Sequence, residues 1–323
     1  MTAVLQLTDV SKNYGSFQAV RNLSFEVDRG TICGFLGPNG AGKTSTIRMI
    51  LGLQGVSSGQ ISILGADDGR KVRDRIGFLP EERGLYKKMT PVEAISYLGS
   101  LKGLPATEGR KRARDMLEQM GLGHAQKKKM KDLSKGMAQK VQLIASVVHQ
   151  PEFVILDEPF SGLDPMNQQG LEAMIRSLAA NGATVLFSTH VMQHAERLCD
   201  KVVLLARGQK AFEGTVAEAR ATSARYLEIE GMLDVNMVAA LPGVGTVETL
   251  SDIDGIVTLK AALVAGAEAQ HTLRAAFVSD LDVRRFQLRE PTLHDAFIAL
   301  TGDHPDDDQR HKATGTQIEE AAQ

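Results

Sequence analysis

The sequence has few cysteines and no long apolar run. Its two cysteines, Cys33 and Cys199, lie in apolar surroundings, which predicts buried free thiols and excludes a disulfide framework or a cysteine zinc site. No apolar run approaches the ~20 residues that a membrane-spanning helix needs. Residues 1–15 also lack the basic segment and apolar core of a secretion signal. We therefore expect a cytosolic protein that reaches a membrane only through a partner chain.

A strong net charge is also missing. Lys and Arg number 37 against 39 Asp and Glu, a net charge of −2, so nothing in the overall balance indicates a nucleic-acid partner. Two basic clusters, residues 110–114 and 127–131, are expected on solvated surfaces. A length of 323 residues, with 43% hydrophobic and 24% charged residues, predicts a globular chain of two domains.

Residues 1–220 show the pattern of an α/β domain. The runs at residues 153–159 and 183–190 are apolar without alternation, which is typical of strands buried on both faces of a parallel sheet. The first 30 residues alternate instead and predict an antiparallel subdomain. Residues 90–150 are helical in pattern and begin with the helix-start signal of Thr90, Pro91 and Glu93. We expect a mixed sheet with an inserted helical lobe at about residues 90–150.

Residues 225–302 predict a second, smaller α+β domain. Strand, helix, hairpin, helix and strand patterns follow one another, and this βαββαβ order is that of a ferredoxin-like domain. Thr292 and Asp295 predict the start of a closing helix, and Gly302 its end. The tail, residues 303–323, has almost no apolar residues and is predicted to be disordered.

A phosphate-binding loop is predicted between a strand and a helix. The segment GPNGAGKT, residues 37–44, fits the pattern G-x-x-x-x-G-K-[ST]. Its glycines let successive backbone N–H groups face phosphate oxygens, and the following helix begins with partial positive charge. Lys43 would reach the β- and γ-phosphates, and Thr44 would supply a hydroxyl to Mg²⁺.

Two carboxylates stand at the end of the buried strand predicted in the run 153–159. Asp157 suits the Mg²⁺ shell, and Glu158 suits a base that activates the attacking water. Because adjacent strand residues point to opposite faces, the two roles can be separated in space.

Before, between and after these motifs the sequence resembles the ATP-binding subunits of ABC transporters. KDLSKGMAQKVQLIASVV resembles the ABC signature and its helix, with Ser134 and Gly136 matching, while Lys135 and Met137 depart from the pattern. FSGLDP resembles the D-loop, FSTH ends at the place of the switch histidine, and VSKNYG carries the aromatic that stacks on adenine. IGFLPEERGLY occupies the place of the Q-loop, with Glu81 where the family has Gln. The resemblance covers residues 1 to about 220.

This resemblance implies a P-loop NTPase with a RecA-like core, which binds Mg-ATP at a dimer interface. The implied catalytic residues are Glu158 and His190, and the implied Mg²⁺ ligands are Thr44, Asp157 and Glu81, with Glu82 as the alternative to Glu81. The implied ATP-binding residues are Tyr14, Gly37, Pro38, Asn39, Gly40, Ala41, Gly42, Lys43, Thr44 and Ser45. The signature residues Ser134, Lys135, Gly136 and Met137 would contact the partner subunit's nucleotide, and Ser161 and Asp164 would form the dimer D-loop.

The resemblance further implies an exporter. LPEERGLY, LSKGM and the ending EPTLHDAFIALTG are similar to the branch that serves drug, sodium or antibiotic exporters. The implied partners are a second ATPase subunit, identical or homologous, and separate transmembrane permease subunits. They would hold the chain at the inner face of the cell membrane.

The alternative is a soluble ABC-type regulatory ATPase that is not coupled to transport. Translation factors of that class carry two cassettes, chromosome-type ATPases a long heptad insertion, and excision-repair enzymes cysteine zinc sites; the sequence has none of these. A regulatory protein that binds ATP without hydrolysing it is a further alternative, against which Glu158 argues, because a pure binder needs no base.

Overall fold

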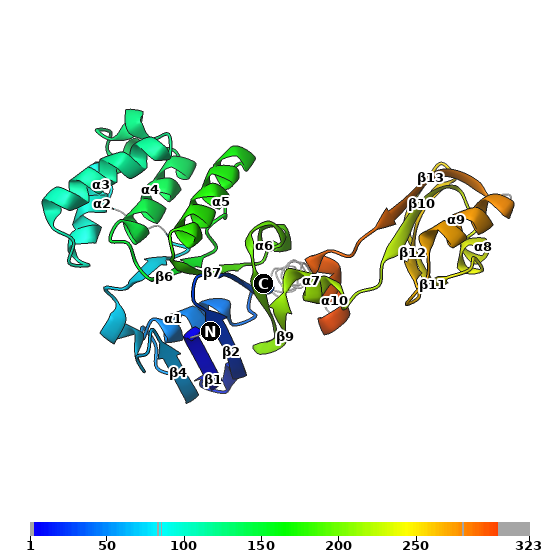
Figure 1. Cartoon of the computed structure of the whole chain (residues 1–323), viewed down its shortest axis with the longest axis horizontal. Helices are drawn as coiled ribbons and strands as arrows, with labels where there is room; N and C mark the ends of the chain where they lie inside the picture. Colours follow the sequence, from blue (N-terminus) through cyan, green and yellow to red (C-terminus); the bar gives the residue numbers. More distant parts are fainter. Residues whose placement is uncertain (1–2, 83, 85, 280, 303–323) are drawn as a thin grey trace, which may run out of the picture. The chain divides into compact units, whose positions relative to one another are not determined.

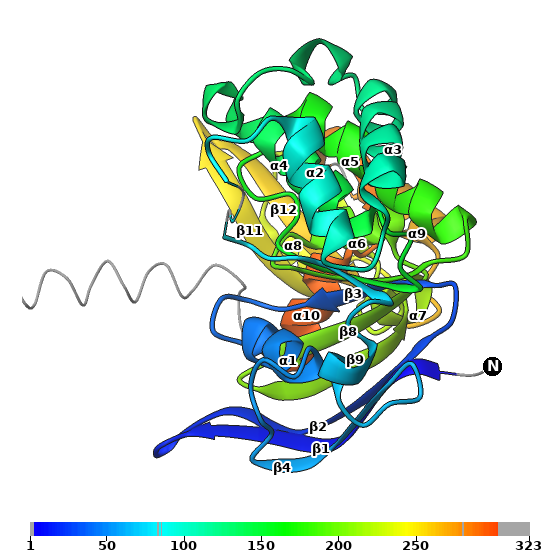
Figure 2. The same ribbon diagram turned by 90° about the vertical axis from the view of Figure 1, so that its left-hand side faces the viewer.

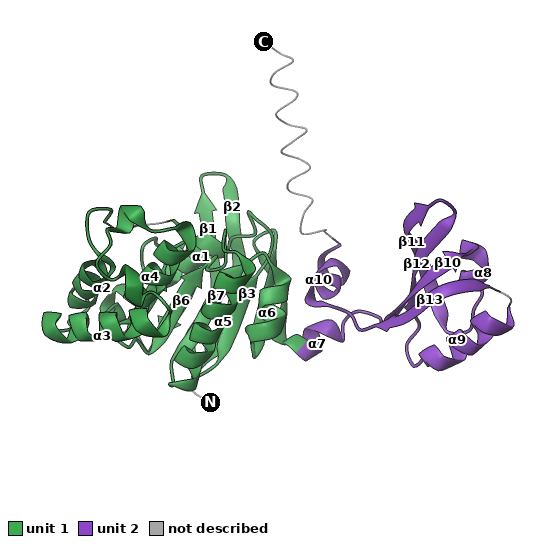
Figure 3. Cartoon of the chain, turned by 90° about the horizontal axis from the view of Figure 1, so that it is seen from above, with its two compact units in different colours: residues 1–216, 303–323 green, residues 217–302 purple. Residues whose placement is uncertain are grey.

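The computed structural model describes residues 3–82, 84, 86–279 and 281–302 (Figure 1). The predicted tail, residues 303–323, therefore lies outside the described residues. The chain divides into two compact units, one up to Val216 and one from Ala217 to Gly302 (Figure 3).

The first unit is built on a six-stranded sheet with the order β5-β6-β7-β3-β8-β9. All neighbours pair in parallel except β8 and β9, which are antiparallel. The strands are β3 (Ile32–Leu36), β5 (Ile76–Leu79), β6 (Phe153–Asp157), β7 (Thr184–Thr189), β8 (Lys201–Ala206) and β9 (Gln209–Thr215). Every residue of β3, β6 and β7 is buried, which explains why their sequences do not alternate.

A second sheet of the first unit is antiparallel, as the alternating N-terminal pattern predicts. Its order is β2-β1-β4, formed by β1 (Ala3–Tyr14), β2 (Phe17–Asp28) and β4 (Ser58–Ile63). One apolar core joins the two sheets, since Leu5 and Phe25 pack in the same cluster as Phe35 and Ile155. The ring centroids of Phe25 and Phe35 lie 5.3 Å apart.

The predicted helical lobe is present and has its own core. It contains α2 (Pro91–Ser100), α3 (Ala106–Gln119) and α4 (Lys135–Val147), packed around Ile95, Leu117 and Ile144. Thr90 and Glu93 cap α2 reciprocally, as their spacing predicts. Figure 2 shows these helices at one end of the first unit and β1, β2 and β4 at the other. The remaining helices of this unit are α1 (Lys43–Ile50), α5 (Pro165–Ala180), α6 (Met192–Leu198) and the short 3₁₀ turns Gly69–Val72, Gly123–Ala125 and Met130–Asp132.

The second unit contains a four-stranded antiparallel sheet with the order β11-β12-β10-β13. Its elements are α7 (Val216–Arg220), β10 (Tyr226–Met232), α8 (Val235–Ala239), β11 (Val244–Ile253), β12 (Ile256–Leu263), α9 (Ala269–Val278), β13 (Asp282–Arg289) and α10 (Leu293–Thr301). The core packs Leu227 and Ile229 of β10 against Leu259 of β12. Thr292 and Asp295 cap α10, and Gly302 ends it in the left-handed region at φ 68°.

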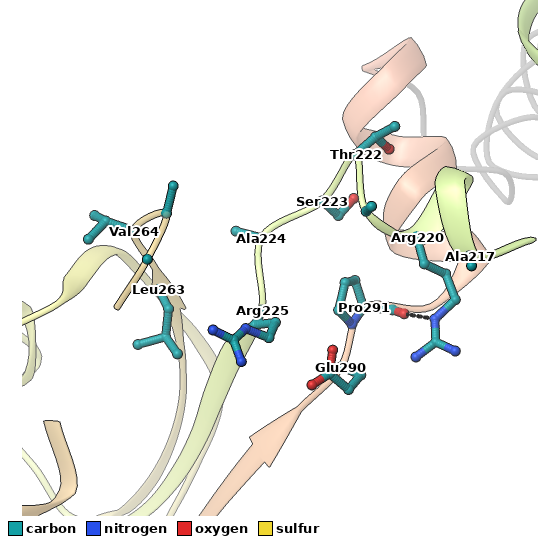
Figure 4. Close-up of a pocket in the computed structure, with 13 residues that line it drawn as sticks. Ala217, Arg220, Thr222, Ser223, Ala224, Arg225, Leu263, Val264, Glu290 and Pro291 are labelled. Carbon is teal, nitrogen blue, oxygen red and sulfur yellow. Dashed lines mark hydrogen bonds between the residues drawn. The ribbon is translucent and has the colours of Figure 1, made fainter. Parts of the chain in front are cut away.

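The second unit also has a pocket of about 620 Å³, which lies beside residues 221–225 and residues 290–291 (Figure 4). Arg220, Arg225 and Glu290 line it, and the Arg220 Nε donates a hydrogen bond to the carbonyl of Pro291. None of the residues predicted to bind ATP lines this pocket.

Candidate nucleotide site

The sheet register brings the predicted motifs to one edge. Leu36 at the end of β3 pairs with Thr189 of β7, and Asp157 at the end of β6 pairs with Ser188. The phosphate loop, Glu158 and His190 follow these strand ends directly, and the Gly37 N–H donates to the Thr189 carbonyl. Motifs more than 100 residues apart in the chain therefore share one site.

The loop from Gly37 to Gly42 can only be built with glycine at its last position. Gly42 has φ 97°, and a Cβ there would lie 2.6 Å from the carbonyl oxygen of Ala19. Gly42 is also the N-cap of α1 and offers no side chain to the free N–H groups of the first turn. These groups, and the partial positive charge at this helix end, remain available to an anion.

The Lys43 side chain is buried at the centre of the site. Its Nζ donates to the carbonyls of Gly37 at 2.7 Å and Pro38 at 3.1 Å, and lies 3.7 Å from Oε1 of Glu158. Burial lowers the pKa of Lys43, while the charge of Glu158 opposes that shift. The ammonium group thus lies between the phosphate loop and the second predicted carboxylate.

Asp157 is buried at the end of β6 and is held by hydroxyl groups. Ser188 of β7 donates a hydrogen bond to its Oδ1, and the Thr44 side chain is a second hydrogen-bonding partner. Burial raises the pKa of Asp157, and the two hydroxyl groups counteract this shift. Asp157 and Thr44, the two residues predicted to hold a cation, are therefore in contact.

Glu158 adopts a left-handed backbone conformation, with φ 47°. Its N–H donates to the carbonyl and the Oγ of Ser188, both at 3.2 Å, and its side chain is buried. The Nδ1 of His190 lies 3.0 Å from its Oε1. This hydrogen bond raises the pKa of His190. The predicted base and the predicted switch histidine thus form a direct pair.

The signature segment and the D-loop contact each other within the chain. Ser134 caps α4 and accepts a hydrogen bond from the Met137 N–H, while Asp164 caps α5 through the Asn167 N–H. The Lys135 side chain lies directly over Gly162, since a Cβ on Gly162 would lie 2.0 Å from its Nζ. Ser161, in the same D-loop, donates its N–H to the Glu158 carbonyl.

Tyr14 lies at the end of β1, and the residue is 43% exposed. Its hydroxyl donates to Gln54 Oε1 at 2.5 Å and lies 3.4 Å from Ser45 Oγ. The Lys12 Nζ lies 5.2 Å from the ring centroid. The ring is therefore fixed at its tip, while its exposed part can receive a planar group.

Glu81 and Glu82 follow β5 and are exposed. The negative charge of Glu81 makes a small upward contribution to the pKa of both Lys43 and His190, so Glu81 lies near the site. The Glu82 carbonyl accepts a hydrogen bond from the Gln142 side chain of α4. Which of the two glutamates replaces the family's Gln, and whether it binds a cation, stays a prediction.

Sequence reasoning missed three residues of this site. Ser188 accepts a hydrogen bond from the Glu158 N–H, and Gln54 accepts one from the Tyr14 hydroxyl. Gln139 donates a hydrogen bond to the Pro159 carbonyl. Ser188 lies two residues before His190, and its place as a polar residue in a fully buried strand is a signal that could have been used.

Comparison with known proteins agrees with this geometry. The family model described as ABC transporter matches residues 20–161. The chain is 37% identical over 300 residues to the ABC transporter ATP-binding protein YhaQ of Bacillus subtilis, covering 93% of this chain and 99% of that protein. It belongs to the ABC transporter ATP-binding proteins.

Two further relatives support this assignment. The bacitracin transport ATP-binding protein BcrA of Bacillus licheniformis is 34% identical over 315 residues, covering 94% of this chain and 98% of that protein. A solved structure of an ATP binding subunit of an ABC transporter is 34% identical with a TM-score of 0.63, and the match covers 68% of this chain and 92% of that one.

The predicted P-loop NTPase fold of the first unit is thereby confirmed, and the chain is an ABC-type ATPase that binds ATP. The ferredoxin-like class of the second unit stays a prediction, supported by the βαββαβ order. Among the described residues, no helix is both long and apolar enough to cross a bilayer.

Proposed function

We propose that this chain is the ATP-hydrolysing subunit of an ABC exporter, acting as a dimer on Mg-ATP beneath separate membrane subunits. One observation carries the proposal. Lys43, Glu158 and His190 come from three separate segments and meet at one edge of the sheet. Oε1 of Glu158 lies 3.7 Å from Nζ of Lys43 and 3.0 Å from Nδ1 of His190. This places a cation, a carboxylate and an imidazole beside a phosphate-binding loop.

The residues present fit a Mg²⁺ ion. Asp157 and Thr44 offer a carboxylate and a hydroxyl in contact with one another, and oxygen ligands of this kind are those that Mg²⁺ prefers. When bound with ATP, the ion would neutralise charge on the β- and γ-phosphates. Glu81 is proposed as a further ligand because its charge reaches the same site.

The chemistry of the chain's own residues follows from their positions. Lys43 would exchange the carbonyls of Gly37 and Pro38 for phosphate oxygens, which bind an ammonium group more strongly. Glu158 would accept a proton from the attacking water, and His190 would hold Glu158 and the γ-phosphate in place. Tyr14 would stack on adenine through its exposed ring.

The dimer is proposed to be head to tail. Each chain has one phosphate loop and one signature, so two copies would form two composite sites, each with the phosphate loop of one subunit and Ser134 of the other. The place of Lys135 over Gly162 of the D-loop supports this, since it brings together the two segments that would face the partner. A close homologue could take the place of the second copy.

Export is proposed from the named relatives. One is a bacitracin transport protein, and another, 34% identical over 302 residues, is the daunorubicin resistance ATP-binding protein DrrA3 of Streptomyces coeruleorubidus. By analogy, closure and reopening of the dimer would drive permease subunits, which would hold this chain at the inner face of the membrane.

The test of this function is transport in inside-out vesicles that contain the chain and its membrane subunits. We expect ATP-dependent uptake of an antibiotic-like compound and stimulation of ATP hydrolysis by that compound. Vesicles in which this chain hydrolyses ATP at the same rate with and without any membrane subunit would instead favour the soluble regulatory ATPase.

The division into two domains gives a second prediction. We propose an ATPase domain up to residue 220 and an accessory domain at residues 225–302 that serves assembly or regulation. A chain cut after Arg220 is expected to stay folded and bind ATP with less than about threefold weaker affinity, because every described residue that forms the nucleotide site lies in the first unit. Calorimetric titration with ATP measures this, and an insoluble truncated chain would show that the boundary is wrong.

A further inference from the structure

Three polar side chains form a stripe along one face of α4, the helix that begins at the signature. Lys135, Gln139 and Gln142 are spaced by four and three residues, which puts them on one side of a helix. Each reaches a different loop of the site. Lys135 lies over Gly162 of the D-loop, Gln139 donates to the Pro159 carbonyl, and Gln142 donates to the Glu82 carbonyl.

Gln139, the middle residue of this stripe, is the one that is buried and hydrogen-bonded next to Glu158. Gln139 is 4% exposed, and its Nε2 donates a hydrogen bond of 3.2 Å to the carbonyl oxygen of Pro159. A buried amide is unfavourable unless it is hydrogen-bonded. Breaking the hydrogen bond between Gln139 and the Pro159 carbonyl would therefore cost free energy, which keeps the two groups together. Pro159 immediately follows Glu158, so the bond acts next to the proposed base.

The backbone of Glu158 needs such support. A non-glycine residue at φ 47° is in a sparsely populated region and stays there only when its surroundings hold it. Ser188 binds the Glu158 N–H, Ser161 binds the Glu158 carbonyl, and Gln139 binds the next carbonyl along the chain. Of these three anchors, Gln139 alone comes from the signature helix.

We propose that Gln139 is a positioning residue, which holds the Glu158 turn in its productive conformation and ties it to the signature helix. The inference rests on the proposed role of Glu158 as the base. When the partner subunit's nucleotide binds at Ser134, a shift of α4 would be transmitted through Gln139 to the Glu158 turn. The partner's nucleotide would thereby influence the position of the base in this chain's own site.

The test is Gln139→Met, which keeps the length and the apolar volume of the side chain but removes the donor. We expect kcat for ATP hydrolysis to fall about 10-fold to 100-fold, because small misplacements of a reacting group are costly. The KM for ATP should change by less than about twofold, since no nucleotide contact is lost. Gln139→Asn keeps the amide but shortens the side chain by one methylene, so kcat should fall less than in Gln139→Met. This second variant keeps the test valid if Gln139→Met fails to fold.

The matched control is Thr272→Val in the second unit. Thr272 is fully buried, and its hydroxyl donates to the carbonyl of Pro242 at 2.8 Å, so this variant also loses one buried hydrogen bond to a proline carbonyl. Both variants should lower the melting temperature by similar amounts. Only Gln139→Met should lower kcat, and equal kcat values in the two variants would overturn the proposal.

A double variant separates positioning from general damage. In a Glu158→Gln background the base is already gone, so Gln139→Met should slow the remaining hydrolysis by less than about twofold. If the double variant instead loses activity by the product of the two single-variant reductions in kcat, the proposal is contradicted. If Glu158→Gln is slow and Gln139→Met is normal, this inference alone fails, whereas normal turnover in Glu158→Gln means that the proposed base is wrong.

Discussion

Glu158→Gln is expected to bind ATP normally and to hydrolyse it about 10²–10⁴-fold more slowly than the wild type. The amide preserves the size of the side chain and its hydrogen bond with His190, but it cannot accept the proton from water. Because hydrolysis is the step that would reopen the dimer, the variant should accumulate as an ATP-bound dimer. Phosphate release and gel filtration with ATP measure the two effects.

The histidine pair offers an independent readout of this variant. The hydrogen bond with Glu158 raises the pKa of His190, so the wild-type imidazole should keep its proton at a higher pH than an ordinary histidine. In Glu158→Gln the hydrogen bond can persist, but the negative charge that stabilises the protonated imidazole is lost. The His190 pKa should therefore fall, which proton NMR titration can follow. More than half of wild-type turnover in the variant would rule Glu158 out as the base.

Lys43→Ala is expected to weaken ATP binding about 10-fold to 100-fold, because a charge-assisted contact with phosphate is lost from a buried position. Ser134→Arg should leave the subunit's own phosphate loop intact and disable the nucleotide bound by its partner. Mixed dimers that carry both changes test whether the two motifs act across the interface.

The arrangement of the two lesions decides the outcome. Lys43→Ala on one subunit and Ser134→Arg on the other should damage the same composite site twice and leave the second site intact. Both lesions on one subunit should damage each site once and abolish nucleotide trapping. Equal trapping in the two arrangements, or the reverse result, would contradict the head-to-tail dimer.

Much of the fold could be predicted because local signals were strong. The unalternating runs became the buried strands β6 and β7, and the alternating N-terminus became the antiparallel sheet of β1 and β2. Thr90 and Thr292 cap their helices through residues three positions on, which is a purely local interaction. The phosphate loop could be placed because its glycines are required by backbone geometry.

The parts that could not be predicted depend on contacts between distant segments. The Ser188 hydroxyl holds Asp157 and Glu158 from a strand 30 residues further along the chain, and Gln54 reaches Tyr14 across 40 residues. Glutamine is a common surface residue, so nothing local marks Gln54, and the place of Ser188 in a buried strand does not reveal which residues it contacts. The place of Lys135 over Gly162 likewise appears only once α4 and the D-loop are packed together.

The most direct measurement of the central claim is the identity of the nucleotide in the closed dimer. Wild-type and Glu158→Gln chains would be loaded with radiolabelled Mg-ATP, separated rapidly from free nucleotide, denatured and analysed for ATP and ADP. If Lys43, Glu158 and His190 form one hydrolytic site, the two proteins bind equal amounts, with mainly ADP recovered from the wild type and mainly ATP from the variant. Equal ADP in both proteins, or no bound nucleotide in either, would contradict the account.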